Sequence, residues 1–434
     1  MFSNSGHRAA SIAALLVFAA SSGKIEAQPR PSLAAEVHRV SPSVNKTYRQ
    51  IHEHPELGKH ETATHDLLLA SLKQIGYTTF VQSTRVPTAV IAVLDTKRPG
   101  PTIALRAEMD ARPDSEPADH NPRSLVAGVM HSCGHDAHAA MLLGAADVLW
   151  RNQNVLSGKI VILFQPAEEV AGGADDIVNE GILTTLGVQA VFAQHSVPRM
   201  PVGTASISPG PALAGSNSFT LTVHGKESHA AQPSDGSDVP GALATLVRGL
   251  IDLPARRLDI ANRPAIISVS YMHVGDTTAL TTLQPTGVAR GTIRAFENVD
   301  PTPANDTSIK AIITEYLRGS APGLRVTTDF VLRRGSPVTT NDQALFDKTV
   351  ATLRNSWPGA INTAPYRGMF SEDFSYYTRA VPSLYFGIGV AKDGLGMVGV
   401  HSAEFTVHPA ALDEGVRLMV LIAQIATKGS ATLR

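Results

Sequence analysis

Residues 130–138 read Met-His-Ser-Cys-Gly-His-Asp-Ala-His and contain Cys133, the only cysteine among 434 residues. Apolar residues recur at helical spacing from Ala139 to Trp150, which predicts a helix directly after this stretch. We therefore expect Cys133 and His135 on a glycine-containing turn that leads into a helix N-terminus, where the helix dipole favours a thiolate. A thiolate and an imidazole two residues apart can both bind one cation of the zinc type. Taken alone, the stretch is equally compatible with an inert buried cysteine beside surface histidines.

The composition is that of a globular protein with more than one domain. The length suggests two or three domains, with 43% hydrophobic and 17% charged residues. The formal net charge of −1 lacks the positive excess of a nucleic-acid-binding protein, so we expect no nucleic acid among its partners. Beyond the first residues, no stretch has the length and apolarity of a membrane-spanning helix.

The N-terminal segment reads as a secretory signal peptide at residues 1–27. His7 and Arg8 precede a short apolar run, and small residues follow up to a plausible cleavage site between Ala27 and Gln28. A frayed N-terminal helix is the alternative interpretation. A signal peptide implies export to the periplasm or the medium, with no membrane span after cleavage. In such an oxidising compartment a lone thiol needs a protected place, either as a metal ligand or in the interior.

The rest of the chain predicts an α/β fold. Residues 32–75 read as mostly helical with a break at Pro55. Apolar runs that predict strands occupy residues 90–94, 102–105, 159–164, 190–193 and 382–390. Because helical segments separate several of these strands, we expect a sheet flanked by helices.

Residues 213–330 have a different texture and predict an inserted domain. Strands are expected at 219–223, 265–270, 291–296 and 325–330, and helices at 239–253 and 307–317. The resulting order, strand-helix-strand-strand-helix-strand, is a ferredoxin-like α+β pattern. The flanking segments, 28–212 and 331–434, would then be two parts of one domain.

Polar residues follow the predicted strands. Asp110 follows the second strand, Glu168 and Glu169 follow the third, and His195 stands just past the end of the fourth. Open α/β sheets place ligand sites at the C-terminal ends of their strands, so we expect these side chains to converge. Each also has a simpler interpretation. The two glutamates would suit the start of a helix, Asp110 could be a loop acid, and isolated histidines are often structural.

Adjacent carboxylates in an extended segment point in different directions. One of Glu168 and Glu169 can therefore bind a metal while the other accepts a proton from water as a general base. Asp110, with Glu108 two residues earlier, is placed to orient a ligating histidine. We regard His131 and His138 as neighbours of the site rather than members of it.

Two candidates lie in the inserted domain, and one near the C-terminus. His229 and Arg294 can serve the site only by domain closure or from another subunit, and ordinary surface positions are the alternative for both. His401 follows an apolar run, as His195 does.

Six sequence blocks together resemble the metal-dependent amidohydrolases of the aminoacylase and carboxypeptidase-G type, nearest to the branch with hippurate hydrolase and the indole-3-acetic acid–amino acid hydrolases. The blocks occur in the order found in that family, over residues 43–421. They are residues 106–111, 130–138, 164–169, 225–233, 371–374 and 400–402. The chain departs from the pattern at Glu108, where many relatives have aspartate.

The resemblance implies a zinc-exopeptidase-like catalytic domain with a central mixed sheet and an inserted lid domain, through which two copies would form a homodimer. It implies a pair of divalent cations, zinc or manganese with cobalt or nickel as further options. Their ligands would be Cys133, His135, Glu169, His195 and His401, with Cys133 as the bridge.

The same resemblance assigns the remaining roles. Glu168 would be the general base and Asp110 the orienting acid. His229 would stabilise the oxyanion, and Arg294 would receive a substrate carboxylate. The expected activity is hydrolysis of the amide bond in N-acyl amino acids or similar small conjugates. An exported exopeptidase acting on dipeptides and a non-catalytic binding protein are the alternatives; Glu168 argues against the latter, because a binding site needs no base beside water.

Overall fold

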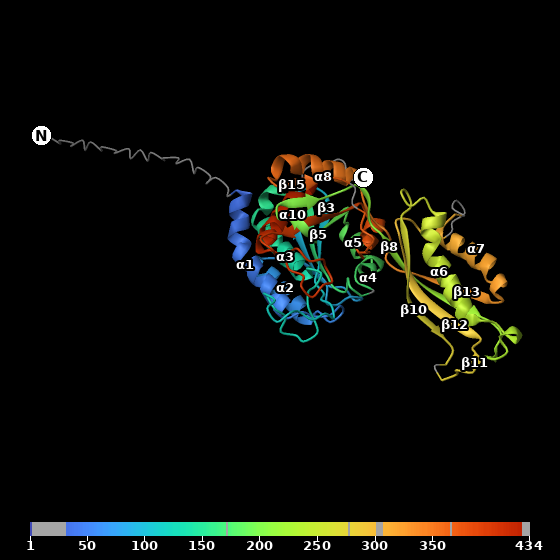
Figure 1. Ribbon diagram of the computed structural model, residues 1–434. Coiled ribbons are helices and arrows are strands. Elements are labelled where there is room, and N and C mark those ends of the chain that lie inside the picture. Colours follow the sequence, from blue (N-terminus) through green and yellow to red (C-terminus); the bar gives the residue numbers. More distant parts are fainter. Residues whose placement is uncertain (2–31, 171, 277, 301–306, 365–366, 428–434) are drawn as a thin grey trace.

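The computed structural model describes Met1 and residues 32–427, apart from residues 171, 277, 301–306 and 365–366. The predicted signal peptide at residues 1–27, Met1 excepted, therefore lies outside the described residues. A large α/β lobe and a smaller lobe that projects from it make up the described chain (Figure 1). None of the described helices combines the length and apolarity needed to cross a membrane.

The large lobe is built on a mixed sheet of eight strands. Among the described residues their order is β1-β2-β4-β3-β5-β16-β6-β15. The strands are β1 (Phe80–Val81), β2 (Val90–Asp95), β3 (Thr102–Glu108), β4 (Lys159–Gln165), β5 (Ala190–Pro201), β6 (Thr204–Ser206), β15 (Ala360–Asn362) and β16 (Ser383–Ala391). β4, β3, β5 and β16 are mutually parallel, whereas β2 and β6 run antiparallel to their neighbours β4 and β16. The predicted α/β class with a central mixed sheet is confirmed.

All five predicted strands of this sheet form, and the largest difference in a boundary is at the fourth. We expected His195 just past the end of its strand, whereas β5 continues to Pro201 and His195 lies within it. The strand is longer because it pairs with β16, with His195 opposite Gly387. Short apolar runs mark only the buried part of a strand, so the sequence pattern missed this extension.

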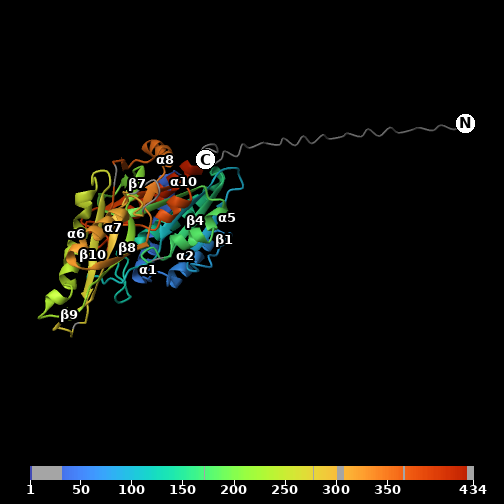
Figure 2. The same ribbon diagram turned by 90° about the vertical axis from the view of Figure 1, so that its right-hand side faces the viewer.

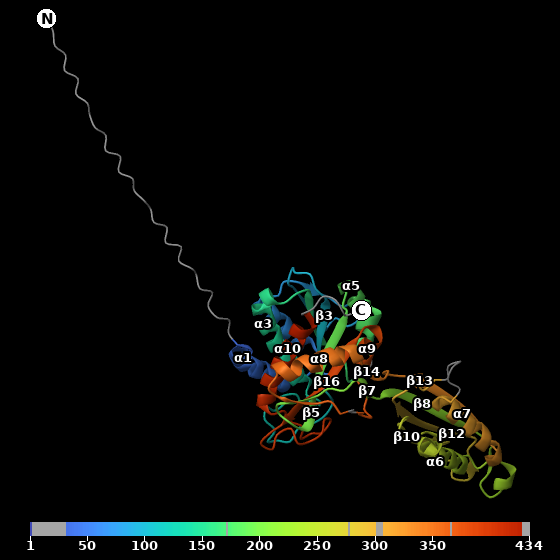
Figure 3. The same cartoon turned by 90° about the horizontal axis from the view of Figure 1, so that it is seen from above.

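Helices cover both faces of the sheet (Figure 3). One face packs against α1 (Leu33–Glu53), α2 (Thr62–Ile75), α3 (His135–Arg151), α8 (Gln343–Ser356) and α10 (Pro409–Thr427). The other packs against α4 (Ala174–Asn179), α5 (Ile182–Leu186) and α9 (Ser375–Ala380). Side chains alternate between the two layers along each strand: Ile103 and Leu105 of β3 join the first, and Ala104 joins the second.

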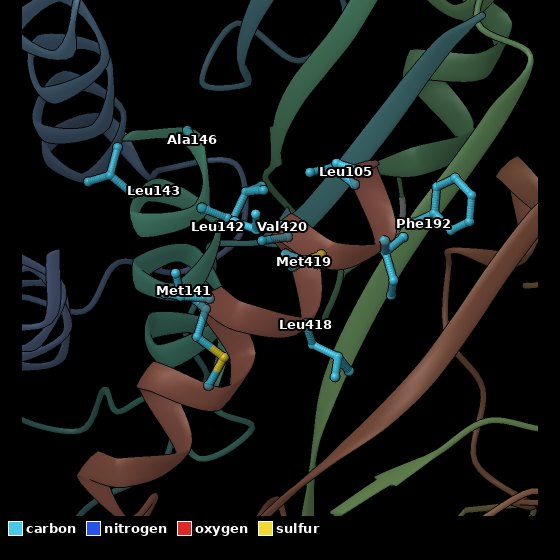
Figure 4. Packing of buried hydrophobic residues seen from close by; sticks show 14 of the residues in the cluster. Leu105, Met141, Leu142, Leu143, Ala146, Phe192, Leu418, Met419 and Val420 are labelled. Carbon is cyan, nitrogen blue, oxygen red and sulfur yellow. The ribbon is translucent and has the colours of Figure 1, made fainter. Parts of the chain in front are cut away.

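Helix α3 is almost completely buried and crosses the first layer. Met141 and Leu142 of α3 pack near Leu418 and Met419 of α10 (Figure 4). A Cβ atom on Gly144 would lie 2.4 Å from Val44 of α1 and 2.8 Å from Val416 of α10, so glycine permits the close approach of three helices. This packing fixes the helix whose N-terminus carries Cys133 and His135.

The smaller lobe has the predicted ferredoxin-like order. Its elements are β8 (Gly215–His224), α6 (Val239–Arg257), β10 (Ala265–Val274), β12 (Thr286–Ala295), α7 (Ile309–Ser320) and β13 (Thr327–Arg334). The four strands form an antiparallel sheet in the order β10-β12-β8-β13, and both helices pack on one face of it. β13 extends four residues past the boundary that we predicted at residue 330.

Smaller elements complete the fold. β7 (Gly210–Leu213) pairs with β14 (Thr339–Asn341) where the chain passes between the lobes. β9 (Ser228–His229) pairs with β11 (Thr282–Leu283), and this pair lies at the end of the small lobe away from the large sheet (Figures 1 and 2). Short 3-10 helices occupy Gln153–Val155, Pro233–Asp235 and Pro322–Leu324.

Candidate active site

Cys133 lies at the turn that starts helix α3. Gly134 is the N-cap residue with a φ of 90°, a left-handed conformation that glycine adopts without strain. His135 is the first residue of α3, whereas we expected it on the turn before a helix starting near Ala139. Cys133 is 6% exposed and His135 is fully buried. The turn therefore holds a thiol and an imidazole side by side in the protein interior.

Asp110 contacts two predicted ligands at once. His135 Nδ1 lies 3.1 Å from Asp110 Oδ1 and 3.0 Å from the Asp110 carbonyl oxygen, and since both oxygens are acceptors, this nitrogen carries the proton. Asp110 Oδ2 accepts a hydrogen bond of 2.9 Å from the backbone N–H of Glu169. His135 Nε2 is buried without a hydrogen-bond partner in the described part of the chain. Its lone pair is thus available to a cation.

His195 points its second ring nitrogen at the thiol. Its Nδ1 donates to the carbonyl oxygen of Ser196 at 2.9 Å, and its Nε2 lies 3.4 Å from Cys133 Sγ. Burial lowers the pKa of His195 to about 4. The ring is therefore neutral near pH 7, the form in which histidine binds metals.

His401 and Glu169 also lie close to the thiol. The His401 backbone N–H donates to the Ser132 carbonyl at 2.7 Å, which ties the His401 loop to the Cys133 turn. His401 Nε2 lies 3.1 Å from Glu169 Oε1, and Arg112 Nη1 lies 2.5 Å from Glu169 Oε2. Hydrogen bonds to Cys133 and Glu169 raise the pKa of His401 to about 9. Burial opposes ionisation of Glu169, but its contact with His401 brings its pKa down to about 2.

These side chains form two groups that share Cys133. In the first, ligand atoms of Cys133, His135 and His195 lie within 4.8 Å of one another, and in the second those of Cys133, Glu169 and His401 do so. Two ligands of a tetrahedral zinc ion, each about 2.0–2.3 Å from the metal, lie roughly 3.3–3.8 Å apart. The Cys133–His195 separation falls in that range, and His135 Nε2 is unpaired. The residues therefore fit a pair of divalent cations, which the two groups would hold with Cys133 in common.

Glu168 lies beside both groups on a constrained turn. It forms a third group with His135 and Glu169. Ala167 has a φ of 60°, and its N–H donates to Glu61 Oε1 at 2.8 Å. Burial raises the pKa of Glu168 well above its ordinary value, and the nearby carboxylates of Glu372 and Asp373 raise it further. Glu61, which is fully buried, was absent from our sequence prediction, because one acid in a helix-flanking loop gives no pattern.

A buried charge cluster lies behind Glu168. Arg106 is fully buried and donates to Glu108, to Gln165 at 2.8 Å, to Glu372 at 2.9 Å and to Asp373 at 2.7 Å. The Asp373 backbone N–H in turn lies 3.3 Å from Glu168 Oε1. The sequence did carry a clue, since an arginine that continues a buried strand needs buried acidic partners.

A second charge cluster connects helix α1 to the N-terminus of α3. His52 is 2% exposed, and its ring nitrogens lie 2.6 Å from Asp136 Oδ2 and 2.7 Å from Glu116 Oε1. Burial lowers the pKa of His52, but the two carboxylates overcome this and raise it to about 9. The imidazolium of His52 thus links α1 to Asp136 of α3 and to the loop that carries Glu116. Our sequence prediction did not include it.

The two candidates of the small lobe have different positions. Arg294 on β12 donates to Ser371 Oγ of the large lobe at 2.6 Å, so this arginine reaches the edge of the site within one chain. His229 is exposed on β9, and its Nδ1 accepts a hydrogen bond of 3.1 Å from the Ala231 N–H. β9 lies at the far end of the small lobe (Figure 2). The structure therefore brings Arg294 to the large lobe but not His229.

Comparison with known proteins gives consistent matches. The model of the family described as Peptidase family M20/M25/M40 matches residues 104–425. Thermostable carboxypeptidase 2 of Saccharolobus solfataricus is 32% identical over 399 residues, which cover 90% of this chain and 97% of that protein. IAA-amino acid hydrolase ILR1-like 4 of Arabidopsis thaliana is 34% identical and covers 85% of this chain and 82% of its own length.

A solved structure is similar over most of the chain. A dinuclear metal-binding peptidase of the M20 family from Bacillus subtilis superposes with a TM-score of 0.77 at 25% identity. The match covers 90% of this chain and 99% of that one.

Proposed function

The chain belongs to peptidase family M20/M25/M40, and from that premise we propose which bond it cleaves and which residues do so. It is a metal-dependent amidohydrolase that acts on amino-acid conjugates. We propose N-acyl amino acids as the substrates. The observation that carries this proposal is the pair of ligand groups that share Cys133, with Glu168 beside them as a free acid.

Two divalent cations are the cofactor. Cys133, His135 and His195 would hold one, and Cys133, Glu169 and His401 the other. When bound, such cations polarise the scissile carbonyl and make water more acidic. Thiolate and imidazole donors favour zinc; the carboxylate and the open positions also suit manganese, cobalt or nickel. We propose zinc or manganese, which metal analysis of the protein purified from its source would decide.

Glu168 would be the general base. It would take the proton of the attacking water and then deliver it to the nitrogen of the departing amino acid. Its raised pKa suits both roles, because a carboxylate with a pKa nearer neutrality both accepts and returns a proton readily. Asp110 would hold His135 and the Glu169 backbone in place.

Arg294 would bind the carboxylate of the amino-acid part. A guanidinium donates two parallel hydrogen bonds to a carboxylate, which would select substrates with a free α-carboxylate. In this structure its partner is the neutral hydroxyl of Ser371. A substrate carboxylate is the stronger acceptor and would replace that hydroxyl.

His229 would complete the site from a second copy of the chain, where it would stabilise the oxyanion. This proposal is supported by its position at the far end of the small lobe. β10 is an edge strand of ten residues with exposed Ile266, Tyr271 and Met272, and such an edge can pair with another strand. We propose a homodimer formed through this edge. We also propose export to the periplasm or the medium, on the basis of residues 1–27.

The test of the proposed function is the substitution Glu168→Gln. Metal content should stay at the parent value, while turnover of an N-acyl amino acid should fall by about 10²–10⁴, the range for loss of a general base. Asp373→Asn is a useful comparison, because it alters the neighbouring acid without removing the proposed base. Turnover at the parent level in the Glu168 variant would exclude Glu168 from this role.

A panel of substrates separates the two candidate activities. N-acetyl and N-aroyl amino acids would be hydrolysed under our proposal, whereas a preference for unblocked dipeptides would identify an exopeptidase. The similarity to a carboxypeptidase keeps the second activity in the panel. Protein stripped of metal is the control for both.

A further inference from the structure

His138 is a fully buried histidine outside the proposed ligand set. It lies on α3 one turn after His135, and the centroid of its ring is 4.6 Å from that of His195. From the sequence we predicted only a neighbour of the site at this position. Its hydrogen bonds give it a more specific part.

The direction of these hydrogen bonds follows from the backbone. The Ser196 N–H, which can only donate, lies 2.9 Å from His138 Nε2, so this nitrogen is an acceptor without a proton. The proton must therefore be on Nδ1, which lies 2.8 Å from Glu108 Oε2. Glu108 is fully buried and is held from its other oxygen by Arg106. The tautomer of His138 is thus set from both sides.

Ser196 passes this constraint to a metal ligand. Its N–H is bound by His138, and its carbonyl oxygen accepts the Nδ1–H of His195 at 2.9 Å. That second bond turns His195 Nε2 toward Cys133 Sγ, 3.4 Å away. Glu108, His138, Ser196 and His195 therefore form one continuous chain of hydrogen bonds. None of its links reaches Glu169 or His401.

We propose that His138 is a positioning residue for His195, and that it acts by accepting the Ser196 N–H. It favours cation binding in the group of Cys133, His135 and His195 and leaves the group of Glu169 and His401 unaffected. The inference rests on the metal pair of the proposed function. It adds a residue whose two ring nitrogens both have hydrogen-bond partners within the protein.

Two amide substitutions test the inference. His138→Gln places a side-chain oxygen near the position of Nε2 and keeps an acceptor for the Ser196 N–H. His138→Asn is shorter, reaches only the position of Nδ1, and keeps the contact with Glu108. Equilibrium dialysis against zinc at graded free concentrations gives the number and the affinity of bound ions per chain.

The parent and His138→Gln should bind two zinc ions with similar affinities. In His138→Asn the affinity for one zinc ion should fall about 10–100-fold, as expected when the partner that orients a ligand is lost. The affinity for the second zinc ion should stay at the parent's value. Two ions bound with the parent's affinities by His138→Asn, or equal losses in both variants, would overturn the inference.

A spectrum of the parent protein tests the tautomer of His138 directly. Long-range proton–nitrogen correlation of ¹⁵N-histidine-labelled, metal-free protein should show His138 as the neutral Nδ1–H tautomer, assigned by its absence in His138→Gln. An Nε2–H tautomer would overturn the inference. If the parent binds no zinc, the proposed metal pair is overturned as well. If the parent binds two ions and His138→Asn binds them with the same affinities, only the role of His138 is refuted.

Discussion

The pH dependence of stability should change when His52 is replaced. His52 is protonated between Asp136 and Glu116, with a pKa of about 9 in the folded protein against about 6.5 in an unfolded chain. Because folding raises this pKa, the contribution is complete below the unfolded value and is lost as pH rises through the folded one. His52→Gln removes the titrating group and keeps a polar side chain.

The magnitude follows from the pKa difference. About 2.5 units at 1.36 kcal/mol per unit give about 3 kcal/mol of folding free energy, present near pH 6 and absent near pH 10. The difference in unfolding free energy between the parent and His52→Gln should therefore shrink by about 3 kcal/mol across this interval.

Urea unfolding followed by tryptophan fluorescence measures the relevant lobe. The two tryptophans, Trp150 at the end of α3 and Trp357 after α8, both belong to the large lobe. Metal-free protein should be used, so that titration of the metal ligands is common to both proteins and cancels in the difference. His38→Gln, at an exposed position of the same helix, is the matched control. A difference between parent and His52→Gln that stays constant from pH 6 to pH 10 would refute the reasoning.

Three further outcomes follow from the structure. Arg294→Lys should raise KM for N-acyl amino acids about 10–100-fold with little change in kcat, because a lost charge-assisted hydrogen bond is worth about 1.5–3 kcal/mol. An equal rise in KM for substrates whose carboxyl group is amidated would show that Arg294 does not bind the carboxylate. Ile266→Lys on the β10 edge should shift the sedimentation of the protein toward the monomer, whereas Val155→Lys, at an exposed position of the large lobe, should not. If both variants sediment as dimers, the β10 edge is not the dimer interface. Gly134→Ala should lower unfolding free energy by at least about 1–2 kcal/mol, since residue 134 has a φ of 90° and a Cβ there would lie 3.1 Å from Ser196 Oγ; an unchanged urea midpoint would contradict it.

The sequence predicted the fold where its signals were local and periodic. The buried run at residues 159–164 became β4, and the alternating run at 219–223 became part of β8. The sheet order could not be read in this way. The run at residues 90–94 and the run at 102–105 follow each other closely in the chain, yet β4 lies between the two strands. Such pairing depends on packing between distant segments, which no short window of sequence contains.

The ligands of the candidate site could be predicted from the sequence for a different reason. Metal-ligand chemistry uses few residue types, so residue type made Cys133 and the acids after the third predicted strand candidates, and the resemblance of six sequence blocks to one family assigned the full set. The residues that hold these ligands had no such mark. Glu61, His52 and His138 act through hydrogen bonds to neighbours that are distant in sequence. Only the folded arrangement gives them partners.

The most direct test of a cation pair bridged by one thiolate is titration of the metal-free protein with cobalt(II). The parent should bind two ions per chain and develop near-ultraviolet absorption from a bond between sulfur and cobalt. Cys133→Ser should lose that absorption and bind both ions more weakly, because Cys133 belongs to both ligand groups. If Cys133→Ser instead binds two ions with the parent's affinity, or if the parent shows no sulfur-to-cobalt absorption, the shared-thiolate centre is contradicted.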